Sequence, residues 1–322
     1  MNVIQNLRAG WKHWEPILFP KCEIHARQVP PWVQIVLVLV FATVGVGLAR
    51  FLPAGGLVGF DWIVYFSNGK VEPLYPPWGS WIVARLTWEL LVGLSLAGVS
   101  LAVLKRAVHP VSAVCALLAL PVLWTIFLGQ LEGLVTLGLS ALPWLVMLAL
   151  VKPQISTFAF GARPIYVAAF FVWLAVSFAI WGWWPATMFG FENYYGEGRL
   201  VTDISLQGFG LPLALLMFWV SRGDMDLLML SGTFATLYLL PYNLLPVVPA
   251  IARLRPRSAL LATLLSWLPF SANWLGQRGW WLGWVFIGFL WLCLAAARYP
   301  QVAPKAWWRR FFVQPARESA SP

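Results

Sequence analysis

Apolar runs of about 20 residues recur along this chain and constrain its fold more than any other feature. A helix needs roughly that length to cross the hydrocarbon core of a bilayer. The chain has 322 residues, of which 60% are hydrophobic and 11% are charged. Backbone groups in lipid must be hydrogen-bonded within their own segment, and these runs are continuous rather than alternating. The sequence therefore predicts an all-α, polytopic bundle of transmembrane helices.

Run lengths and breaks at charged residues or proline predict eight spans. They are 33–52, 79–104, 110–128, 131–151, 165–184, 205–221, 258–276 and 280–297. A further apolar stretch, 227–251, is interrupted by Pro241, Pro246 and Pro249. This stretch either crosses once or dips in as two half-helices and returns as a re-entrant hairpin.

The distribution of Lys and Arg favours the hairpin. Arg253, Arg255 and Arg257 follow the stretch directly, and positive residues are enriched on the cytoplasmic side of membrane proteins. With a hairpin both termini are cytoplasmic, and the net charge of +10 is explained by topology, without a nucleic-acid partner. We expect about eight full crossings plus the hairpin, with membrane lipids as partners. The predicted divisions are a cytoplasmic tail at 1–32, the transmembrane domain at 33–297 and a basic, aromatic cytoplasmic tail at 298–322.

The sequence lacks the motifs of several common enzyme classes. Its three cysteines are far apart, and its three histidines have no metal-ligand spacing. No GxSxG, HExxH or phosphate-binding glycine loop is present. We therefore expect no metal site and no cofactor.

Asp61 is the main candidate for chemistry on the predicted outer side. It follows a glycine-rich turn, Tyr65 comes one helical turn later, and Tyr75 opens an aromatic, proline-rich re-entry into the membrane. An aspartate in such a loop is more commonly a solvated surface residue. The aromatic and glycine residues around Asp61 weaken that interpretation.

Arg85 and Glu89 are ionisable residues inside the predicted second span. Their spacing of four places them on one face of a helix, roughly 9 Å and 15 Å below its outer end. Charges at such depth face the bundle interior or a water-filled cavity. They form either a structural ion pair or a cationic wall beneath the outer loop.

Two further polar groups lie at the ends of the predicted span 131–151. Gln130 and Glu132 lie at its start, and Lys152 and Gln154 follow it. A single crossing places Lys152 on the cytoplasmic side, whereas a short hairpin turning at Pro143 returns it to the outer side. Hydropathy favours the single crossing, although the later topology does not decide between the two.

The order of these groups resembles glycosyltransferase family 87. The resemblance is carried by Asp61, Tyr65, Tyr75-Pro76-Pro77, Gly129-Gln130 and Lys152-Pro153-Gln154, and later by Pro241-Tyr242-Asn243. That family belongs to the GT-C class of polyprenyl-phosphate-sugar-dependent transferases. The resemblance implies a GT-C-like fold in the plasma membrane of a prokaryote, with the active site on the outer side.

The resemblance also implies the reaction. A sugar, mannose in characterised relatives, moves from a polyprenyl-phosphate donor to a hydroxyl of a lipid or glycan acceptor, with inversion. Asp61 is then the expected general base, and Arg85 or Lys152 neutralises the leaving phosphate. The implied substrate-binding residues are Tyr65, Tyr75, Arg85, Glu89, Gln130, Glu132, Lys152, Gln154 and Asn243.

Two other functions compete with the transferase. A catalytically inactive relative would act as a membrane scaffold or as a subunit of a complex. A transporter for a small or lipid-linked solute would suit charges inside the membrane, although no internal repeat is visible.

Overall fold

A computed structural model describes residues 29–67, 75–186, 202–236 and 238–299, together with Lys12, Glu15 and Phe19. These residues form helices joined by turns, which confirms the predicted all-α class. The predicted tails, 1–32 and 298–322, lie almost entirely outside the described residues.

Four helices of the described residues are long and apolar enough to cross a membrane. They are α2 (Pro31–Phe51), α4 (Trp88–Arg106), α10 (Pro164–Trp181) and the stretch Gln277–Arg298, which comprises α16 (Gln277–Trp281) and α17 (Gly283–Arg298). A fifth span results if α5 (Pro110–Leu117) and α6 (Leu120–Leu128), which meet at a bend of 42°, are taken together. Proline at the first turn begins α2, α5 and α10, where its missing N–H and fixed φ are favourable.

The other predicted spans are broken into shorter helices. Span 131–151 is α7 (Glu132–Ser140) and α8 (Val146–Ala149), and span 205–221 is η4 (Gln207–Gly210) and α12 (Leu211–Ser221). Span 258–276 is α14 (Pro256–Ser266), η6 (Leu268–Ser271) and α15 (Ala272–Leu275). The remaining elements are η1 (Trp62–Phe66), α3 (Pro77–Val83), α9 (Pro153–Ala159), η2 (Phe160–Ala162), α13 (Met225–Ala235) and η5 (Pro241–Arg253).

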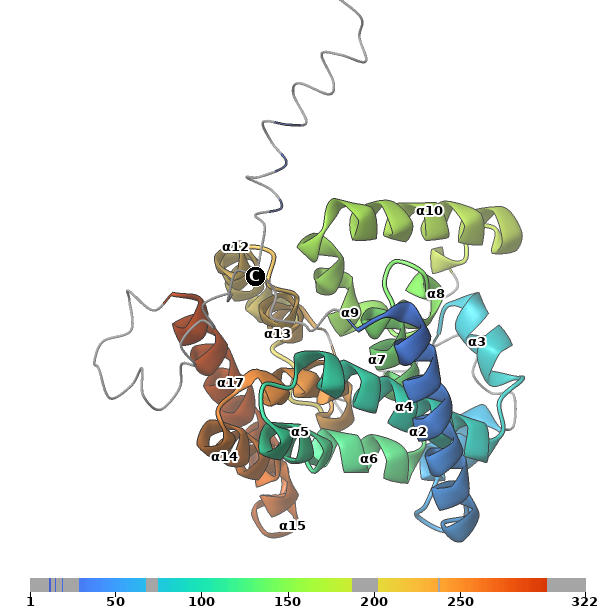
Figure 1. The fold of residues 1–322 in the computed structure, drawn as a ribbon, viewed down its shortest axis with the longest axis horizontal. Coiled ribbons are helices and arrows are strands. Elements are labelled where there is room, and N and C mark those ends of the chain that lie inside the picture. Colours follow the sequence, from blue (N-terminus) through green and yellow to red (C-terminus); the bar gives the residue numbers. More distant parts are fainter. Residues whose placement is uncertain are drawn as a thin grey trace, which may run out of the picture.

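Close backbone contacts hold α2 and α7 against the central helix α4, and α2 is seen beside α4 in Figure 1. A Cβ atom added to Gly45 of α2 would lie 2.7 Å from the Cα of Gly93 in α4. One added to Gly133 of α7 would lie 2.3 Å from the Cβ of Ser95 in α4. Small residues at such crossings let helices pack closely where lipid provides no hydrophobic driving force. These contacts fix the position of α7, and with it Glu132.

Residues 225–253 fold back on themselves. Helix α13 leads away from Asp224 and Asp226, and η5, a 3₁₀ helix of 13 residues, returns to them. Arg253 at the end of η5 lies 2.8 Å from oxygens of both Asp224 and Asp226. Most of η5 is buried, so its backbone runs through the protein core.

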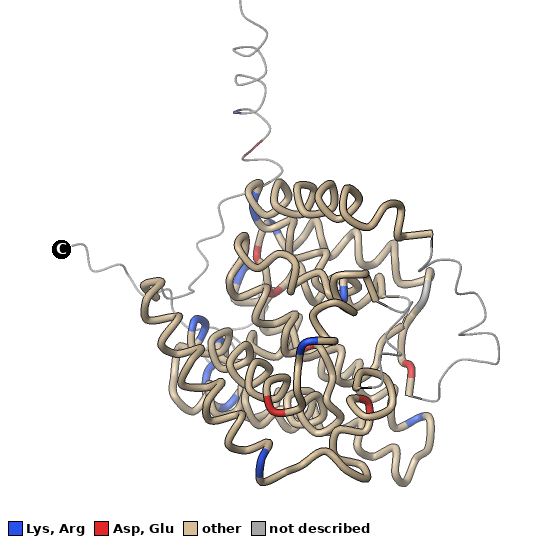
Figure 2. Tube along the Cα trace, turned by 90° about the vertical axis from the view of Figure 1, so that its right-hand side faces the viewer, with Lys and Arg blue, Asp and Glu red and all other residues tan. Residues whose placement is uncertain are grey.

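The surface of the bundle is apolar and sparsely charged. Figure 2 shows how few Lys, Arg, Asp and Glu residues occur along the described chain. Few side chains of helices α2 and α10 are buried, and α10 extends along one side of the bundle (Figure 1). Phe209 is 92% exposed and Trp144 is 87% exposed. Apolar exposure on this scale, together with the long apolar helices, indicates a membrane protein.

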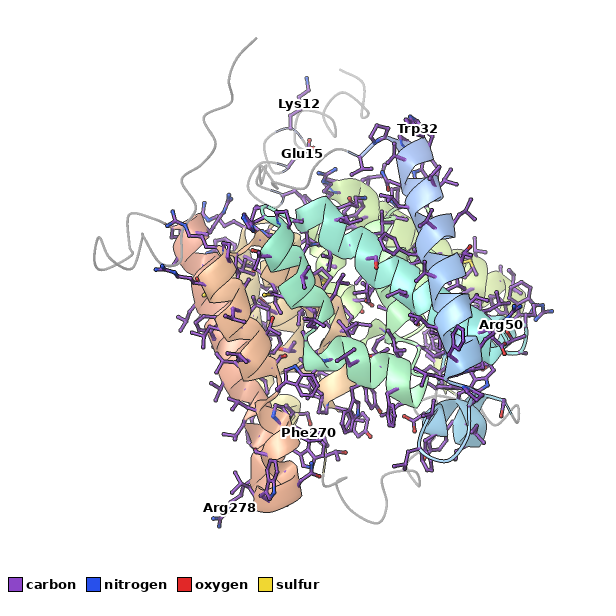
Figure 3. The ribbon with its side chains drawn as sticks, turned by 60° about the horizontal axis from the view of Figure 1, so that its bottom comes forward. Lys12, Glu15, Trp32, Arg50, Phe270 and Arg278 are labelled. Atoms are coloured by element: carbon purple, nitrogen blue, oxygen red, sulfur yellow. The ribbon has the colours of Figure 1, made fainter. Side chains whose placement is uncertain are left out.

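Figure 3 shows Arg50 and Arg278 at one end of the bundle and Trp32, at the start of α2, at the other. We call the two ends the Arg50 end and the Trp32 end.

Candidate functional site

Asp61 is buried at the junction of three elements and is not a solvated loop residue. It is 8% exposed and directly precedes η1. The turn before it contains Gly59 at φ 66, whose N–H donates to the carbonyl of Phe127 at 2.7 Å. A Cβ atom at Gly59 would lie 3.0 Å from the ring of Trp88, so the turn requires glycine in both conformation and space. This turn places Asp61 beside the end of α6.

Gln130 is brought to Asp61 by the turn that ends α6. Gly129 terminates that helix in the left-handed conformation at φ 77, and a Cβ there would lie 2.8 Å from Trp62 and from Trp88. The next side chain is Gln130, which is 4% exposed and donates its Nε2–H to Oδ2 of Asp61. Asp61 therefore accepts a hydrogen bond from a buried amide.

Lys152 reaches the same place because the chain between it and Gln130 turns back. Helices α7 and α8 pack closely, with a Cβ at Gly138 only 2.2 Å from the amide nitrogen of Ala149. Lys152 Nζ donates to Gln130 Oε1 at 2.8 Å and to Glu132 Oε1 at 2.6 Å. The single crossing predicted for 131–151 is therefore wrong, because both ends of this segment meet at one point.

Asn243 completes the network from a distant part of the chain. Its Oδ1 accepts from the N–H of Leu240 at 2.8 Å at the start of η5, which turns its amide group toward Glu132. Asn243 Nδ2 donates to Glu132 Oε1 at 2.5 Å. The polar network consists of Asp61, Gln130, Glu132, Lys152 and Asn243, and we call it the Asp61 network.

Two tyrosines flank the ammonium group of this network. Lys152 Nζ lies 5.5 Å from the ring centroid of Tyr75 and 5.1 Å from that of Tyr242. Both distances are typical of cation–π contacts. Burial raises the pKa of Tyr75 to about 12, so its hydroxyl stays protonated at neutral pH. Tyr242 was named in the sequence only as part of a motif, and the structure places it in the site.

The electrostatics of the network are governed by burial. Asp61, Glu132 and Lys152 together carry a formal charge of −1. Burial raises the pKa of Asp61, and the hydrogen bond from Gln130 and the charge of Lys152 only partly offset this rise. Burial alone would lower the pKa of Lys152, but the carboxylate of Glu132 raises it above its ordinary value. Lys152 is therefore an ammonium in the resting site.

Glu132 has one carboxylate oxygen without a protein partner. The side chain is 2% exposed, and Oε2 is buried with no hydrogen-bond partner, whereas Oε1 accepts from both Lys152 and Asn243. Buried polar atoms are nearly always hydrogen-bonded in folded proteins. This oxygen is consequently a candidate for contact with a ligand.

Four other predicted site residues occupy different positions. Arg85 and Glu89 were predicted to share a helix face, which is wrong because α3 ends at Val83 and α4 begins at Trp88, capped by Thr87. Arg85 is exposed, donates to the carbonyl of Trp81 at 2.7 Å and lies over the Trp81 ring.

Glu89 lies half-buried in the first turn of α4. Gln154 is exposed in the first turn of α9, and Tyr65 in η1 is 37% exposed.

An apolar groove adjoins the Asp61 network. Its volume is about 520 Å³, and its lining is almost entirely apolar. It lies among α2, α4, α6 and η6, and Val58, Trp88 and Phe127 contribute to its wall. These three residues also frame the turn that carries Asp61, through the contacts of Gly59 described above. The groove and the turn that carries Asp61 therefore share wall residues.

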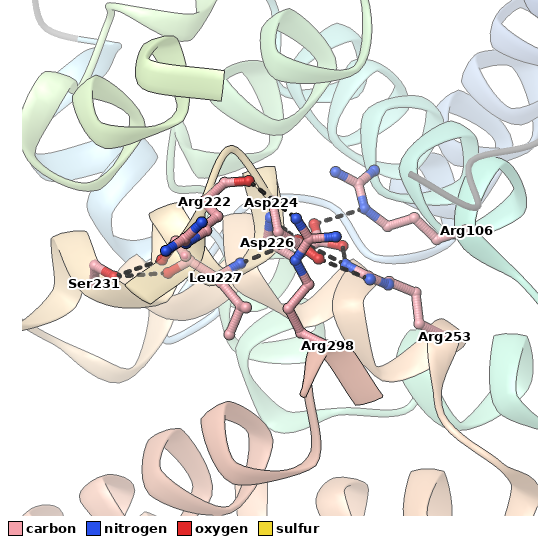
Figure 4. A network of polar contacts seen from close by, with 9 residues as sticks. Arg106, Arg222, Asp224, Asp226, Leu227, Ser231, Arg253 and Arg298 are labelled. Carbon is pink, nitrogen blue, oxygen red and sulfur yellow. Dashed lines mark hydrogen bonds and ion pairs between the residues drawn. The ribbon is translucent and has the colours of Figure 1, made fainter. Parts of the chain in front are cut away.

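A second buried polar cluster was missed in the sequence. Arg253 binds Asp224 with two parallel hydrogen bonds of 2.8 and 2.9 Å, and Arg106 Nε binds Asp226 at 2.8 Å (Figure 4). In the sequence Arg253 was read only as a topology signal. The available signal was the presence of two acidic residues, Asp224 and Asp226, directly before an apolar stretch that ends in arginine.

The two clusters lie at opposite ends of α4. Trp88 at its first residue adjoins the Asp61 network, and Arg106 at its last residue belongs to the ion cluster. The rise of a helix puts these ends about 27 Å apart. Element η5 joins them, with Asn243 near one end and Arg253 at the other.

Comparison with known proteins adds no further constraint: no family model, no curated protein and no solved structure matches this chain. The resemblance to glycosyltransferase family 87 stays a prediction based on the motifs quoted above.

Proposed function

We propose that this chain is an integral membrane glycosyltransferase. It transfers a sugar from a polyprenyl-phosphate donor to an acceptor hydroxyl, with inversion. The observation that carries the proposal is the convergence of Asp61, Gln130, Glu132, Lys152 and Asn243 into one buried network. These residues come from distant parts of the chain, and the network adjoins an apolar groove.

Asp61 is the general base of the proposed reaction. It takes the proton of the acceptor hydroxyl as the hydroxyl oxygen attacks the anomeric carbon from the face opposite the phosphate. The bond between that carbon and the phosphate oxygen breaks, and polyprenyl phosphate leaves with the bonding electrons. A phosphate leaving group needs no protonation, so one carboxylate base is enough, unlike the two carboxyl groups of glycoside hydrolases.

Lys152 is the cation placed to stabilise the leaving phosphate. It is buried beside Asp61's partner Gln130, whereas Arg85 is exposed and held over Trp81. A preorganised charge in a site without water is worth a few kcal/mol to such a transition state. Gln130 and Asn243 supply amides for sugar hydroxyls, and Tyr75 and Tyr242 supply aromatic faces.

The apolar groove accommodates part of the isoprenoid chain of the donor. Its walls offer almost no polar partners, so its occupant must be a hydrocarbon. Its position beside the turn of Asp61 would place a phosphate at the end of that hydrocarbon near the network.

Placement in the membrane follows from the charges at the two ends of the bundle. Arg106, Arg222, Arg253 and Arg298 gather around one cluster (Figure 4), and Arg50 and Arg278 lie at the Arg50 end (Figure 3). The positive-inside rule favours a cytoplasmic ion cluster and an external Asp61 network, and the family resemblance implies the plasma membrane of a prokaryote. The shorter, broken helices make up the remaining crossings of a GT-C-like bundle.

Labelling of single cysteines in intact cells tests this orientation. A cysteine at position 278 should react with a membrane-impermeant reagent, and one at position 257 should not. The opposite pattern would exclude an external active site.

The transferase activity itself is tested with purified protein. The protein is incubated with a set of radiolabelled polyprenyl-phosphate sugars and a membrane extract, and products are separated from the donor. Transfer of label that requires the protein supports the proposal. A folded protein that transfers no label from any donor in the set contradicts it.

A transporter is the second candidate, and one observation favours it. Buried charged clusters close both ends of α4, as the gates of an alternating-access protein would. A transporter of a lipid-linked solute would move labelled donor across proteoliposomes without any acceptor, whereas the proposed transferase would not. That flux measurement separates the two functions.

A further inference from the structure

In the structure Lys152, the only cation of the Asp61 network, already has hydrogen-bond partners. A lysine ammonium has three hydrogens to donate. Lys152 donates two of its hydrogens to Gln130 Oε1 and Glu132 Oε1, and its ammonium lies near the rings of Tyr75 and Tyr242. A phosphate that binds Lys152 must therefore compete with these partners.

The net charge of the site indicates that Glu132 is the partner of Lys152 that a bound phosphate displaces. Asp61, Glu132 and Lys152 sum to −1, and a phosphodiester donor would bring the buried site to −2. Like charges at short range in a poorly solvated site are strongly unfavourable, and they raise the proton affinity of carboxylates. Uptake of one proton returns the site to −1.

Glu132 is better placed than Asp61 to receive that proton. Glu132 contacts Lys152 directly and loses this counter-charge when a phosphate takes its place, whereas Asp61 contacts Gln130. Its Oε2 is buried and unpartnered, so it can carry a hydrogen and donate it to an incoming phosphate oxygen. The charged, titratable or polar groups that face Glu132 from the surrounding segments are Asp61, Tyr75, Gln130, Lys152, Tyr242 and Asn243.

We propose that the donor phosphate replaces Glu132 on Lys152 and that Glu132 takes up one proton from solvent as it does so. The protonated Glu132 then donates to the phosphate, while Asp61 stays ionised and ready to act as the base. This inference rests on the proposed function, because it assumes a lipid-linked phosphate as the ligand. Donor binding is thereby coupled to pH through a residue other than the base.

The coupling is measured with a probe that does not titrate itself. Farnesyl methyl phosphate is a diester with one fixed negative charge, and farnesol is its neutral counterpart. Both are titrated calorimetrically into the full-length protein in detergent between pH 5 and pH 8. Each titration is repeated in two buffers that differ in ionisation enthalpy, which reveals the number of protons taken up.

We expect the diester to bind with uptake of one proton in the upper part of this range. The affinity for the diester should then fall about tenfold for each unit by which the pH rises, which is the linkage for one proton. Farnesol should bind without proton uptake. Glu132→Gln should bind the diester with no proton uptake and with an affinity independent of pH, and its binding of farnesol shows that it is folded.

Three outcomes would overturn the inference, and they differ in what else they affect. Diester binding that is independent of pH in the parent protein refutes the coupling and leaves the proposed function intact. Proton uptake that persists in Glu132→Gln and disappears in Asp61→Asn assigns the proton to Asp61. If the diester binds no more tightly than farnesol at any pH, the site does not recognise phosphate, and the proposed function is contradicted as well.

Discussion

Lys152 Nζ lies 2.6 Å from Glu132 Oε1, although 20 residues separate the two in sequence. The side chain of Glu132 is 2% exposed and that of Lys152 is 10% exposed, and the pair holds the two ends of the α7–α8 hairpin together. The pair also joins the only cation of the Asp61 network to a carboxylate whose second oxygen, Oε2, has no hydrogen-bond partner.

Replacement of Lys152 by Met should destabilise the protein by about 3–5 kcal/mol, because Glu132 is then buried without a counter-charge. The double variant Lys152→Met/Glu132→Gln should recover much of this loss, since neither residue is then charged. Thermal unfolding in detergent measures both effects. Equal melting temperatures for Lys152→Met and the parent would show that the ion pair does not form.

The close packing of α7 on α4 gives a second prediction. Gly133→Ala adds a methyl group 2.3 Å from the Cβ of Ser95, which forces the helices apart and should cost about 1–3 kcal/mol or more. Gly288→Ala in α17 is the matched control, because nothing lies within 4 Å of its added Cβ. The control should melt at the parental temperature or slightly higher. A Gly133→Ala variant as stable as Gly288→Ala would contradict the α4–α7 packing.

The activity should depend on the ionisation of Asp61. Burial raises the pKa of Asp61 above its ordinary value of 3.8, and a base works only when ionised. The transfer rate should therefore fall as the pH falls through this raised pKa. Gln130→Ala removes a hydrogen bond that lowers the pKa of Asp61, so it should move this acid limb to higher pH.

A profile of kcat/KM against pH for the parent and the Gln130→Ala variant tests both statements. An acid limb that stays in place, or moves to lower pH, in Gln130→Ala would show that Asp61 is not the group that titrates.

The sequence predicted the helical class and the five residues of the Asp61 network. Helical class follows from run length alone. Asp61, Gln130, Glu132 and Lys152 stood out as polar groups beside glycine and proline in an apolar chain, and Asn243 was implied by the family resemblance. Their mutual distances did not follow, because hydropathy cannot distinguish a crossing from a hairpin of the same length. The contact of Lys152 with Gln130 decided that question.

One wrong prediction and one missed cluster have identifiable structural causes. Arg85 and Glu89 were placed on one helix because the apolar run is continuous, but Thr87 accepts a hydrogen bond from the N–H of Leu90 and begins a new helix. The ion cluster was missed because Arg106 and Asp226 are 120 residues apart. Such a pairing depends on tertiary packing and leaves no periodic pattern in the sequence.

The central claim, that Asp61 is the base of sugar transfer, is tested most directly by the initial transfer rate of Asp61→Asn. Asparagine preserves size and accepts a hydrogen bond from Gln130, but it cannot take a proton. With a saturating polyprenyl-phosphate sugar the rate should fall about 10²–10⁴-fold relative to the parent. A variant that transfers sugar at the parental rate would contradict the account.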